Sequence, residues 1–383
     1  MISTDVLTIQ LKDNNPYGTP LRRAYAGPFS MLDRGSFNGA GSPHTRWKIP
    51  SLEGGSMGSL HTMRDKLKIG LIHPSNVLLL SREALATSGL IVAKFSARSV
   101  DPGSKILGLR IQLTTGDLSP KCNISADPLC DGGGYNNYEV EVVDRMGPDS
   151  FCPDHGVFIS KTKNADSPQP FQWAIDANPQ DIKLVDFIRP NGSTAMATMG
   201  DYRQLADALF HAGTRSGSQY EFVDQANRLH FYVVDVERSN TGVLSYTVAV
   251  RSLDGSGGVS RRGVKLSSGV VPGGRATKEG VACWFELRNT GSYVDGGAGG
   301  HPGNATEYLK SDVYRLSANV DGRGWRVEVP NALATAEFGG STLVHVAVGA
   351  SKDAARSATV TLTARSESDP SVVSTAKCKV AKI

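Results

Sequence analysis

Short apolar runs separated by turn residues occupy much of the chain between residues 76 and 251. These runs are rich in β-branched residues, which fit the pleated surface of a sheet. They predict strands at 76–80, 90–96, 106–114, 138–143, 156–160 and 171–176. Two longer runs, 228–236 and 242–251, flank a turn and predict a hairpin.

Helical spacing occurs at two places in the sequence. Apolar residues recur at helical intervals from 57 to 67, and Gly70 stands where a helix would end. His61 would then lie on the polar face of this helix. A second helix is predicted over 200–213, because Asp201 and Gln204 can cap its first turn and Gly213 can end it. The pattern as a whole predicts a mainly β fold with a few helices.

The last hundred residues alternate strand and turn after a Gly- and Ser-rich segment at 255–274, which has the composition of a linker. Strands are predicted at 280–288, 312–320, 325–329, 341–347, 358–365 and 376–380. Their length and spacing are typical of an antiparallel sandwich of the immunoglobulin kind. Trp284 lies beside Phe285 in the first of them and is expected in the core.

Charge and hydropathy exclude several classes of partner. The chain has 41 Lys plus Arg against 37 Asp plus Glu, and the basic residues are scattered. Nucleic acids and anionic membranes need clustered positive charge, so neither is expected as a partner. The sequence lacks an apolar run long enough for a membrane span and has no signal peptide in its first thirty residues.

Cysteines and glycosylation sequons favour an extracellular protein whose N-terminus is missing. Sequons occur at Asn123, Asn191 and Asn304, and they predict a glycoprotein. The five cysteines are Cys122, Cys130, Cys152, Cys283 and Cys378. Cys283 and Cys378, on the first and last sandwich strands, are natural disulfide partners. Either Cys122 pairs with Cys130 and leaves Cys152 free, or Cys130 pairs with Cys152 and leaves Cys122 free.

The most distinctive stretch runs from Tyr25 to Lys66. Its segments 30–39, 43–47 and 54–58, together with 131–138 and 200–213, resemble the M6 family of secreted zinc metalloproteases, the immune inhibitor A-like peptidases. The resemblance implies a zincin-like protease domain with protein or peptide substrates. Met31 occupies what resembles the Met turn beneath the metal. The resemblance implies that this stretch forms a substrate-binding wall beside the Met turn, and the candidate residues for that wall or for a structural role in it are Arg34, Gly35, Phe37, Asn38, His44 and Trp47.

The zinc-binding motif of that family is not found in this sequence. His-Glu-x-x-His places two imidazoles on one helix face, but none of the eight histidines is followed by Glu or has a partner four residues on. The resemblance places the motif just upstream of Asp13. His44 and His61 are weak alternative ligands. Zinc is therefore expected in a full-length member and not in this chain.

The acidic, Gly-rich region around residue 131 could instead hold calcium. Asp127, Asp131 and Asp144 supply carboxylates, and the 131–134 carbonyls could complete a mixed oxygen shell. A solvated turn is the alternative, since the EF-hand spacing is absent.

The predicted organisation combines these features. A partial zincin-like domain occupies 1–75, a β-rich remainder of the protease region 76–254, a linker 255–274 and an immunoglobulin-like sandwich 275–383. The resemblance predicts the C-terminal part of a secreted metallopeptidase that is inactive as this chain. The alternative is a non-catalytic extracellular protein that binds glycans or cell-surface proteins through its sandwich.

Overall fold

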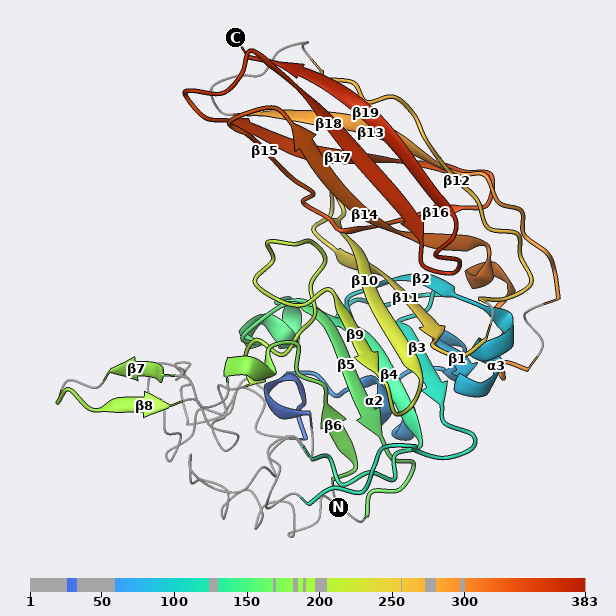
Figure 1. Cartoon of the computed structure of the whole chain (residues 1–383). Helices are drawn as coiled ribbons and strands as arrows, with labels where there is room; N and C mark the ends of the chain where they lie inside the picture. The colour runs from blue at the N-terminus through green and yellow to red at the C-terminus, as the bar shows by residue number, and fades with distance from the viewer. Residues whose placement is uncertain are drawn as a thin grey trace. The chain divides into compact units, whose positions relative to one another are not determined.

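The computed structural model describes residues 26–32, 59–123, 130–167, 170–181, 185–188, 191–196, 205–255, 257–272, 280–296 and 300–382 (Figure 1). The chain divides into two compact units. The first comprises residues 1–80, 95–211 and 237–246, and the second comprises residues 81–94, 212–236 and 247–383.

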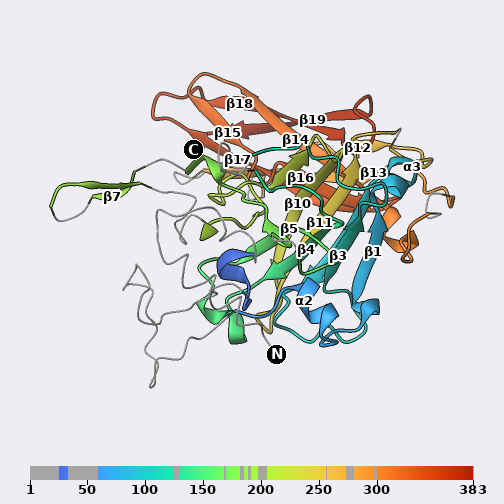
Figure 2. The same cartoon turned by 90° about the horizontal axis from the view of Figure 1, so that it is seen from below.

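The first unit is built around a sheet with the strand order β1-β3-β4-β5-β6, in which β3 to β6 pair in antiparallel fashion. Its strands are β1 Val77–Ser81, β3 Gly108–Gln112, β4 Asn137–Val143, β5 Gly156–Thr162 and β6 Gln172–Ala174. Figures 1 and 2 both show β4 between β3 and β5. All seven residues of β4 are buried, so side chains on both of its faces lie inside the protein.

Short elements complete the first unit. Helix α2, Met63–Lys68, contacts β4, and Gly70 follows it with a positive φ of 71°. The 3-10 turns are η2 Gly27–Phe29, η4 Pro74–Asn76, η5 Gly147–Phe151 and η6 Pro179–Asp181. Strands β7 Val185–Ile188 and β8 Thr194–Met196 pair as a hairpin. The helix predicted from residue 57 is thus confirmed from Met63 onward.

A second sheet has the order β2-β11-β10-β9. Its strands are β2 Ile91–Ser96, β11 Leu244–Ser252, β10 Leu229–Arg238 and β9 Glu221–Asp224. The predicted hairpin of β10 and β11 is confirmed. Helix α3, Arg82–Ser88, was not predicted, since its seven residues are too few to show a helical period, but Ser81 Oγ caps it by accepting from the N–H of Ala84 at 3.3 Å.

The C-terminal strands form a sandwich of two antiparallel sheets, ordered β12-β13-β17-β15 and β16-β14-β18-β19. The first sheet comprises β12 Val264–Leu266, β13 Val281–Asn289, β17 Ser341–Ala350 and β15 Trp325–Glu328. The second comprises β16 Leu333–Glu337, β14 Ser311–Asp321, β18 Ser357–Ser366 and β19 Val373–Ala381, and η8 Thr306–Leu309 precedes β14. Side chains from both sheets share one core, which includes Phe285, Tyr314 and Val346.

The prediction of a mainly β protein with few helices is confirmed, and each predicted range overlaps an observed strand. Strands β7, β8, β9, β12 and β16 were not predicted. The segment 255–274, expected to be a linker, contains β12, which pairs with β13. The proposed domain limits stay predictions.

The helix predicted over 200–213 is wrong in its described part. Phe210 forms an antiparallel bridge with Val157 on β5, and each N–H donates to the other's carbonyl at 2.9 Å. Leu205 and Leu209 pack in a core with Phe29. Pairing with a strand and burial of both leucines outweigh the capping signals, because tertiary contacts override a weak local preference.

Two sequence expectations about side chains are settled by the structure. Cys122 pairs with Cys130 and Cys283 with Cys378, with Cα–Cα distances of 5.6 and 6.2 Å, which leaves Cys152 as a buried free thiol. The expectation that Trp284 lies in the core is wrong. Trp284 is half-buried on the outer face of β13, because its neighbours Cys283 and Phe285 take the inward positions. Its ring stacks on that of His345, with 4.7 Å between the ring centroids.

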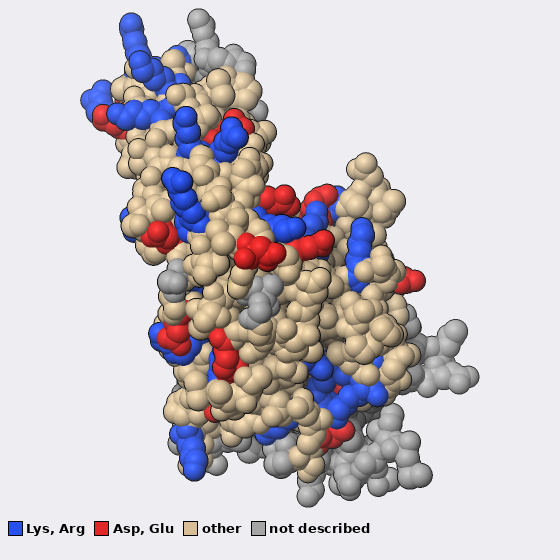
Figure 3. All heavy atoms as spheres, turned by 90° about the vertical axis from the view of Figure 1, so that its right-hand side faces the viewer, with Lys and Arg blue, Asp and Glu red and all other residues tan. Residues whose placement is uncertain are grey.

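The surface mixes both signs of charge. Figure 3 shows Lys and Arg interspersed with Asp and Glu on the face in view. In the described part of the chain, no helix is long and apolar enough to cross a membrane.

Candidate functional site

The turn that carries Met31 has an unusual backbone. Ala26 and Gly27 have φ values of 79° and 60°, a left-handed region that L side chains rarely adopt. A Cβ atom on Gly27 would lie 2.6 Å from Cδ1 of Leu205, so the turn requires glycine there. Such a conformation at a buried alanine persists only where its surroundings hold it in place.

Phe29 anchors this turn in a hydrophobic cluster. Its ring is fully buried and lies 5.8 Å from the ring of Phe158 on β5. The cluster also contains Ala26, Val143, Cys152, Ala174, Leu205, Ala208 and Leu209. Met31, by contrast, is 45% exposed, and its N–H donates to the carbonyl of Leu60 at 3.2 Å. The turn therefore fixes Phe29 inside while it presents Met31 at the surface.

A buried ion pair links this turn to the segment before α2. Arg98 donates to Asp149 through Nε to Oδ2 at 2.8 Å and through Nη2 to Oδ1 at 2.9 Å. The same Nη2 donates to the carbonyl of Phe29 at 2.7 Å, and Oδ1 of Asp149 accepts from the N–H of Leu60 at 2.8 Å. Because Leu60 also accepts from Met31, the pair closes a ring of hydrogen bonds beneath the turn.

Charged side chains of α2 and β4 extend this pair. Oε1 of Glu141 lies 3.4 Å from Nη1 of Arg98 and accepts from the N–H of Met63 at 3.2 Å. Lys66 donates through Nζ to the carbonyl of Arg98 at 2.9 Å. The first turn of α2 is thereby tied to β4 and to the ion pair.

A second group of charges surrounds Glu139, which precedes Glu141 by two residues on β4. Glu139 accepts from Nε of Arg110 on β3 at 3.0 Å, and Nη1 of Arg64 donates to Asp65 at 2.9 Å. We define the charge cluster as the cations Arg64, Lys66, Arg98 and Arg110 with the anions Asp65, Glu139, Glu141 and Asp149. Each sign occurs four times, so the cluster is formally neutral.

Burial sets the ionisation of the cluster. Desolvation raises the pKa of both Glu139 and Glu141, and Oε2 of each is buried without a hydrogen-bond partner in the described part of the chain. Desolvation acts in the same sense on Asp149, but the charge and hydrogen bonds of Arg98 outweigh it, so the pKa of Asp149 lies below its ordinary value. The Arg98–Asp149 pair is therefore the ionised centre of the cluster.

The free thiol beside this pair is not a nucleophile. Cys152 donates through Sγ to Oδ1 of Asp149 at 3.5 Å. Burial raises the pKa of the Cys152 thiol to about 12, so the thiolate that a nucleophile requires is scarce at neutral pH. The arrangement can position the turn and the segment before α2, and it holds no group suited to covalent catalysis.

Most of the predicted wall lies outside the described residues. This holds for Arg34, Gly35, Phe37, Asn38, His44 and Trp47. Asp127, one of the predicted calcium ligands, also lies outside the described residues. His61 is described, but it precedes the cap residue Thr62 and so is not on the polar face of α2 as predicted. Its Nδ1 is buried and makes no hydrogen bond to any described residue.

The structure gives no support to a metal site in its described part. No three His, Cys, Asp or Glu side chains there gather closely enough to hold an ion. Asp131 instead pairs with Lys161 at 2.8 Å, and Asp144 pairs with Arg238 at 2.9 Å. The calcium site stays a prediction.

The three sequon asparagines, Asn123, Asn191 and Asn304, are all exposed. Exposure is a requirement for glycosylation, which stays a prediction at each of them.

Sequence reasoning missed the charge cluster. Glu139 and Glu141 alternate with apolar residues, a pattern that normally places such side chains in solvent. The signal that could have found them is the place of 138–143 between other predicted strands, since a central strand is buried on both faces. Arg98 and Asp149 are isolated in sequence and carry no local signal.

Comparisons with known proteins cover nearly the whole chain. A family model described as a middle domain matches residues 68–253, and one described as a Peptidase M6-like domain matches residues 265–382. The second range contains the strands of the sandwich from the second residue of β12 onward, and neither range includes Met31.

A curated relative extends the match. The chain is 59% identical over 374 residues to a protein of Arthroderma benhamiae named "Putative secreted metallopeptidase". The alignment covers 96% of this chain and 54% of the relative, so the chain spans about half the length of that protein.

Proposed function

Because this chain belongs to the M6-like metallopeptidase family, we propose that it is part of a secreted enzyme that hydrolyses peptide bonds. The observation that carries the proposal is the 59% identity over 96% of the chain to a relative named as a secreted metallopeptidase. Three exposed sequon asparagines and two disulfides suit an oxidising, extracellular compartment.

The described residues do not fit the zinc ion that such an enzyme would use. They contain no group of three candidate ligands, and the 383 residues lack His-Glu-x-x-His. The metal ligands would then belong to a part of the longer enzyme outside these 383 residues.

The role left to this chain is to form and support a wall of the active site. Met31 is presented at the surface of a turn that Phe29 and the Arg98–Asp149 pair hold from beneath. We assign Met31 as the Met-turn residue and the segment 34–47 as the adjoining substrate wall. A partial zincin-like domain at 1–75 and an immunoglobulin-like sandwich at 275–383 complete this proposal.

Protease assays on two forms of the protein test the proposal. The purified 383-residue chain should leave casein intact in the presence of zinc. A longer product of the same gene, with His-Glu-x-x-His before residue 1, should cleave casein, and a chelator should stop the cleavage. Zinc-dependent cleavage by the 383-residue chain would show that its own residues hold the metal.

The alternative function is a non-catalytic extracellular binding protein that acts through the sandwich. A longer product that binds glycans or cell-surface proteins and has no peptidase activity would favour it.

A further inference from the structure

His301 lies on a segment, residues 300–305, that contacts helix α3 within the second compact unit. The imidazole is half-buried and is hydrogen-bonded to both ends of this helix. The N–H of Ser81, which caps the helix, donates to Nδ1 of His301 at 3.2 Å. Oγ of Ser88, the last helical residue, lies 2.8 Å from Nε2 of the same ring. One side chain therefore bridges the two ends of α3.

The backbone beside His301 also lies close to the helix. A Cβ atom added to Gly300 would lie 3.4 Å from Cβ of Ala84, in the first turn of α3. Gly300 has a φ of 100°, a conformation that glycine adopts readily and other residues rarely do. At the far end of the segment Ala305 is fully buried. The segment is thus held at one end by α3 and at the other by the protein interior.

The hydrogen bonds of His301 join the two ranges that the family models match. Helix α3 lies in the range 68–253, described as a middle domain, and His301 lies in the range 265–382, described as a Peptidase M6-like domain. Both partners belong to the second compact unit, which contains residues 81–94 and 247–383. His301 is therefore a direct link between the two matched ranges.

The hydrogen bonds define the protonation state of the ring. A backbone N–H can only donate, so Nδ1 of His301 accepts from Ser81 and carries no proton. The neutral imidazole then has its proton on Nε2, which donates to Oγ of Ser88. A proton added at Nδ1 would meet the N–H of Ser81 donor to donor. Protonation would therefore break the bond to Ser81 and keep the bond to Ser88.

The charged groups of the elements around His301 do not hold it as an imidazolium. They are Arg82 and Glu83 on α3, Asp254, Arg261 and Arg262 on the segment that also contacts α3, and Glu307 on η8. Nε of Arg82 donates to Glu83 at 3.0 Å, and Asp254 accepts from Arg228 at 2.9 Å. Burial, and not one of these charges, lowers the pKa of the His301 imidazole to about 4.

We propose that His301 is an acid-sensitive latch, which holds residues 300–305 on α3 while its ring is neutral and releases them when the ring takes up a proton. A released imidazole is protonated below about pH 6.5, whereas burial keeps the latched ring neutral to about pH 4. Because the released form binds the proton more tightly, release becomes more favourable as pH falls from 6.5 toward 4. The latch requires no peptidase activity from this chain.

Hydrogen exchange at the amide of Ser81 reports the latch directly, because this N–H is the donor to Nδ1 of His301. Its protection factor in the full chain, corrected for the pH dependence of intrinsic exchange, should fall about tenfold between pH 7 and pH 5. The amide of Leu316, which donates to the carbonyl of Ala332 at 2.8 Å in the same unit, is the reference and should stay protected. A constant protection factor at Ser81 would overturn the proposal.

A pair of glutamine variants separates the charge from the hydrogen bond. His301→Gln keeps an oxygen that can accept from Ser81 but cannot titrate, so Ser81 should lose its pH response in this variant. His73→Gln is the matched control, because Nδ1 of His73 also accepts a backbone N–H, from Ser75 at 3.2 Å, on the exposed surface. H73Q should show the wild-type response. The same pH response in H301Q and H73Q would overturn the proposal.

The ring itself can be observed in the wild-type chain, whatever the variants do to folding. In nitrogen-15 correlation spectra of histidine-labelled protein, one ring should stay neutral, with its proton on Nε2, down to about pH 4. If every ring is protonated by pH 5, the proposal is wrong.

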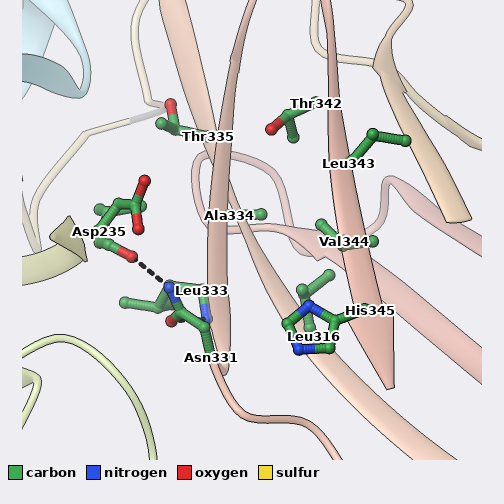
Figure 4. Close-up of a pocket in the computed structure, with 11 residues that line it drawn as sticks. Asp235, Leu316, Asn331, Leu333, Ala334, Thr335, Thr342, Leu343, Val344 and His345 are labelled. Atoms are coloured by element: carbon green, nitrogen blue, oxygen red, sulfur yellow. Dashed lines mark hydrogen bonds between the residues drawn. The ribbon is translucent and has the colours of Figure 1, made fainter. Parts of the chain in front are cut away.

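The signal of that ring should disappear in H301Q and remain in His345→Gln. His345 belongs to the same unit, where it stacks on Trp284 and lines a cavity of about 270 Å³ (Figure 4). Loss of the signal in H345Q instead would assign the neutral ring to the cavity and overturn the role of His301.

Discussion

Arg98 and Asp149 form a bidentate ion pair with donor–acceptor distances of 2.8 and 2.9 Å, and the exposed fractions of their side chains are 1% and 0%. Arg98 also donates to the carbonyl of Phe29, and Asp149 accepts from the N–H of Leu60. The carbonyl of Leu60 in turn accepts from the N–H of Met31. A charge-assisted pair in such a site fixes geometry more than it adds stability, because desolvation offsets much of the attraction. Its expected role is to hold the Met31 turn in one position.

Removal of one partner should be strongly destabilising. Arg98→Met leaves Asp149 buried and unpaired, which costs about 3–5 kcal/mol in comparable pairs. Hydrogen exchange at the amides of Met31 and Leu60 should become much faster in this variant. Arg228→Met, which breaks the exposed pair with Asp254, is the control and should cost about 1 kcal/mol or less. Similar costs for the two variants in chemical denaturation would argue against the role of the pair.

Two carboxylates should give opposite pH dependences of stability. Hydrogen bonds from His230 and Arg315 outweigh desolvation at Glu221 and lower its pKa to about 2. A depressed folded-state pKa contributes stability above the unfolded value of about 4.3, and this contribution is lost as pH falls toward 2. Glu221→Gln should therefore be less stable than wild type at pH 7, and the difference should shrink between about pH 4.5 and 2.

Glu141 should behave in the opposite sense. Burial raises the pKa of Glu141 in the folded protein. Its contribution to the free energy of unfolding is therefore fully present below about pH 4.3, the pKa in the unfolded chain, and is lost as pH rises through the raised pKa of the folded protein. Glu141→Gln keeps an oxygen for the N–H of Met63 and removes the charge, so it should gain stability relative to wild type as pH increases. Denaturant midpoints from pH 2 to 8 measure both effects. Parallel pH curves for the two variants would show that these shifts are wrong.

The two disulfides should differ in their contribution to stability. In the chain-entropy account, the 95-residue separation of Cys283 and Cys378 is worth about 4.7 kcal/mol, and the 8-residue separation of Cys122 and Cys130 about 2.5 kcal/mol. Paired serine variants should show this order in thermal unfolding. In the native protein Cys152 should not react with a thiol reagent, because its side chain is buried. Rapid labelling of Cys152 would contradict its place beside Asp149.

Much of the fold could be predicted from the sequence, because strands such as β4 and β13 show their period locally. The helix expected over 200–213 failed because Phe210 finds a partner on β5 far along the chain, which capping residues do not reveal. The charge cluster had the same difficulty, since Arg98 and Asp149 are 51 residues apart and meet only in the folded protein. The Met-turn role of Met31 stays a prediction from family resemblance, and no sequence signal indicated that Arg98 and Asp149 lie beneath it.

The turn itself can be tested through Gly27. Gly27→Ala places a methyl group 2.6 Å from Cδ1 of Leu205 and forces an alanine into a positive φ. It should therefore lower the free energy of unfolding by more than the positive φ alone would. Gly70→Ala is the matched control, because Gly70 has a φ of 71° and no heavy atom within 4 Å of an added Cβ. Gly70→Ala should lower the free energy of unfolding by about 1–2 kcal/mol, the usual penalty for an alanine in the left-handed region.

The excess cost of Gly27→Ala over Gly70→Ala should come from the contact with Leu205. The double variant Gly27→Ala with Leu205→Ala removes the clash, so the two substitutions should cost less together than the sum of their separate costs. Denaturant unfolding of the four proteins in this cycle measures the coupling. Strict additivity would mean that Leu205 does not press on the turn.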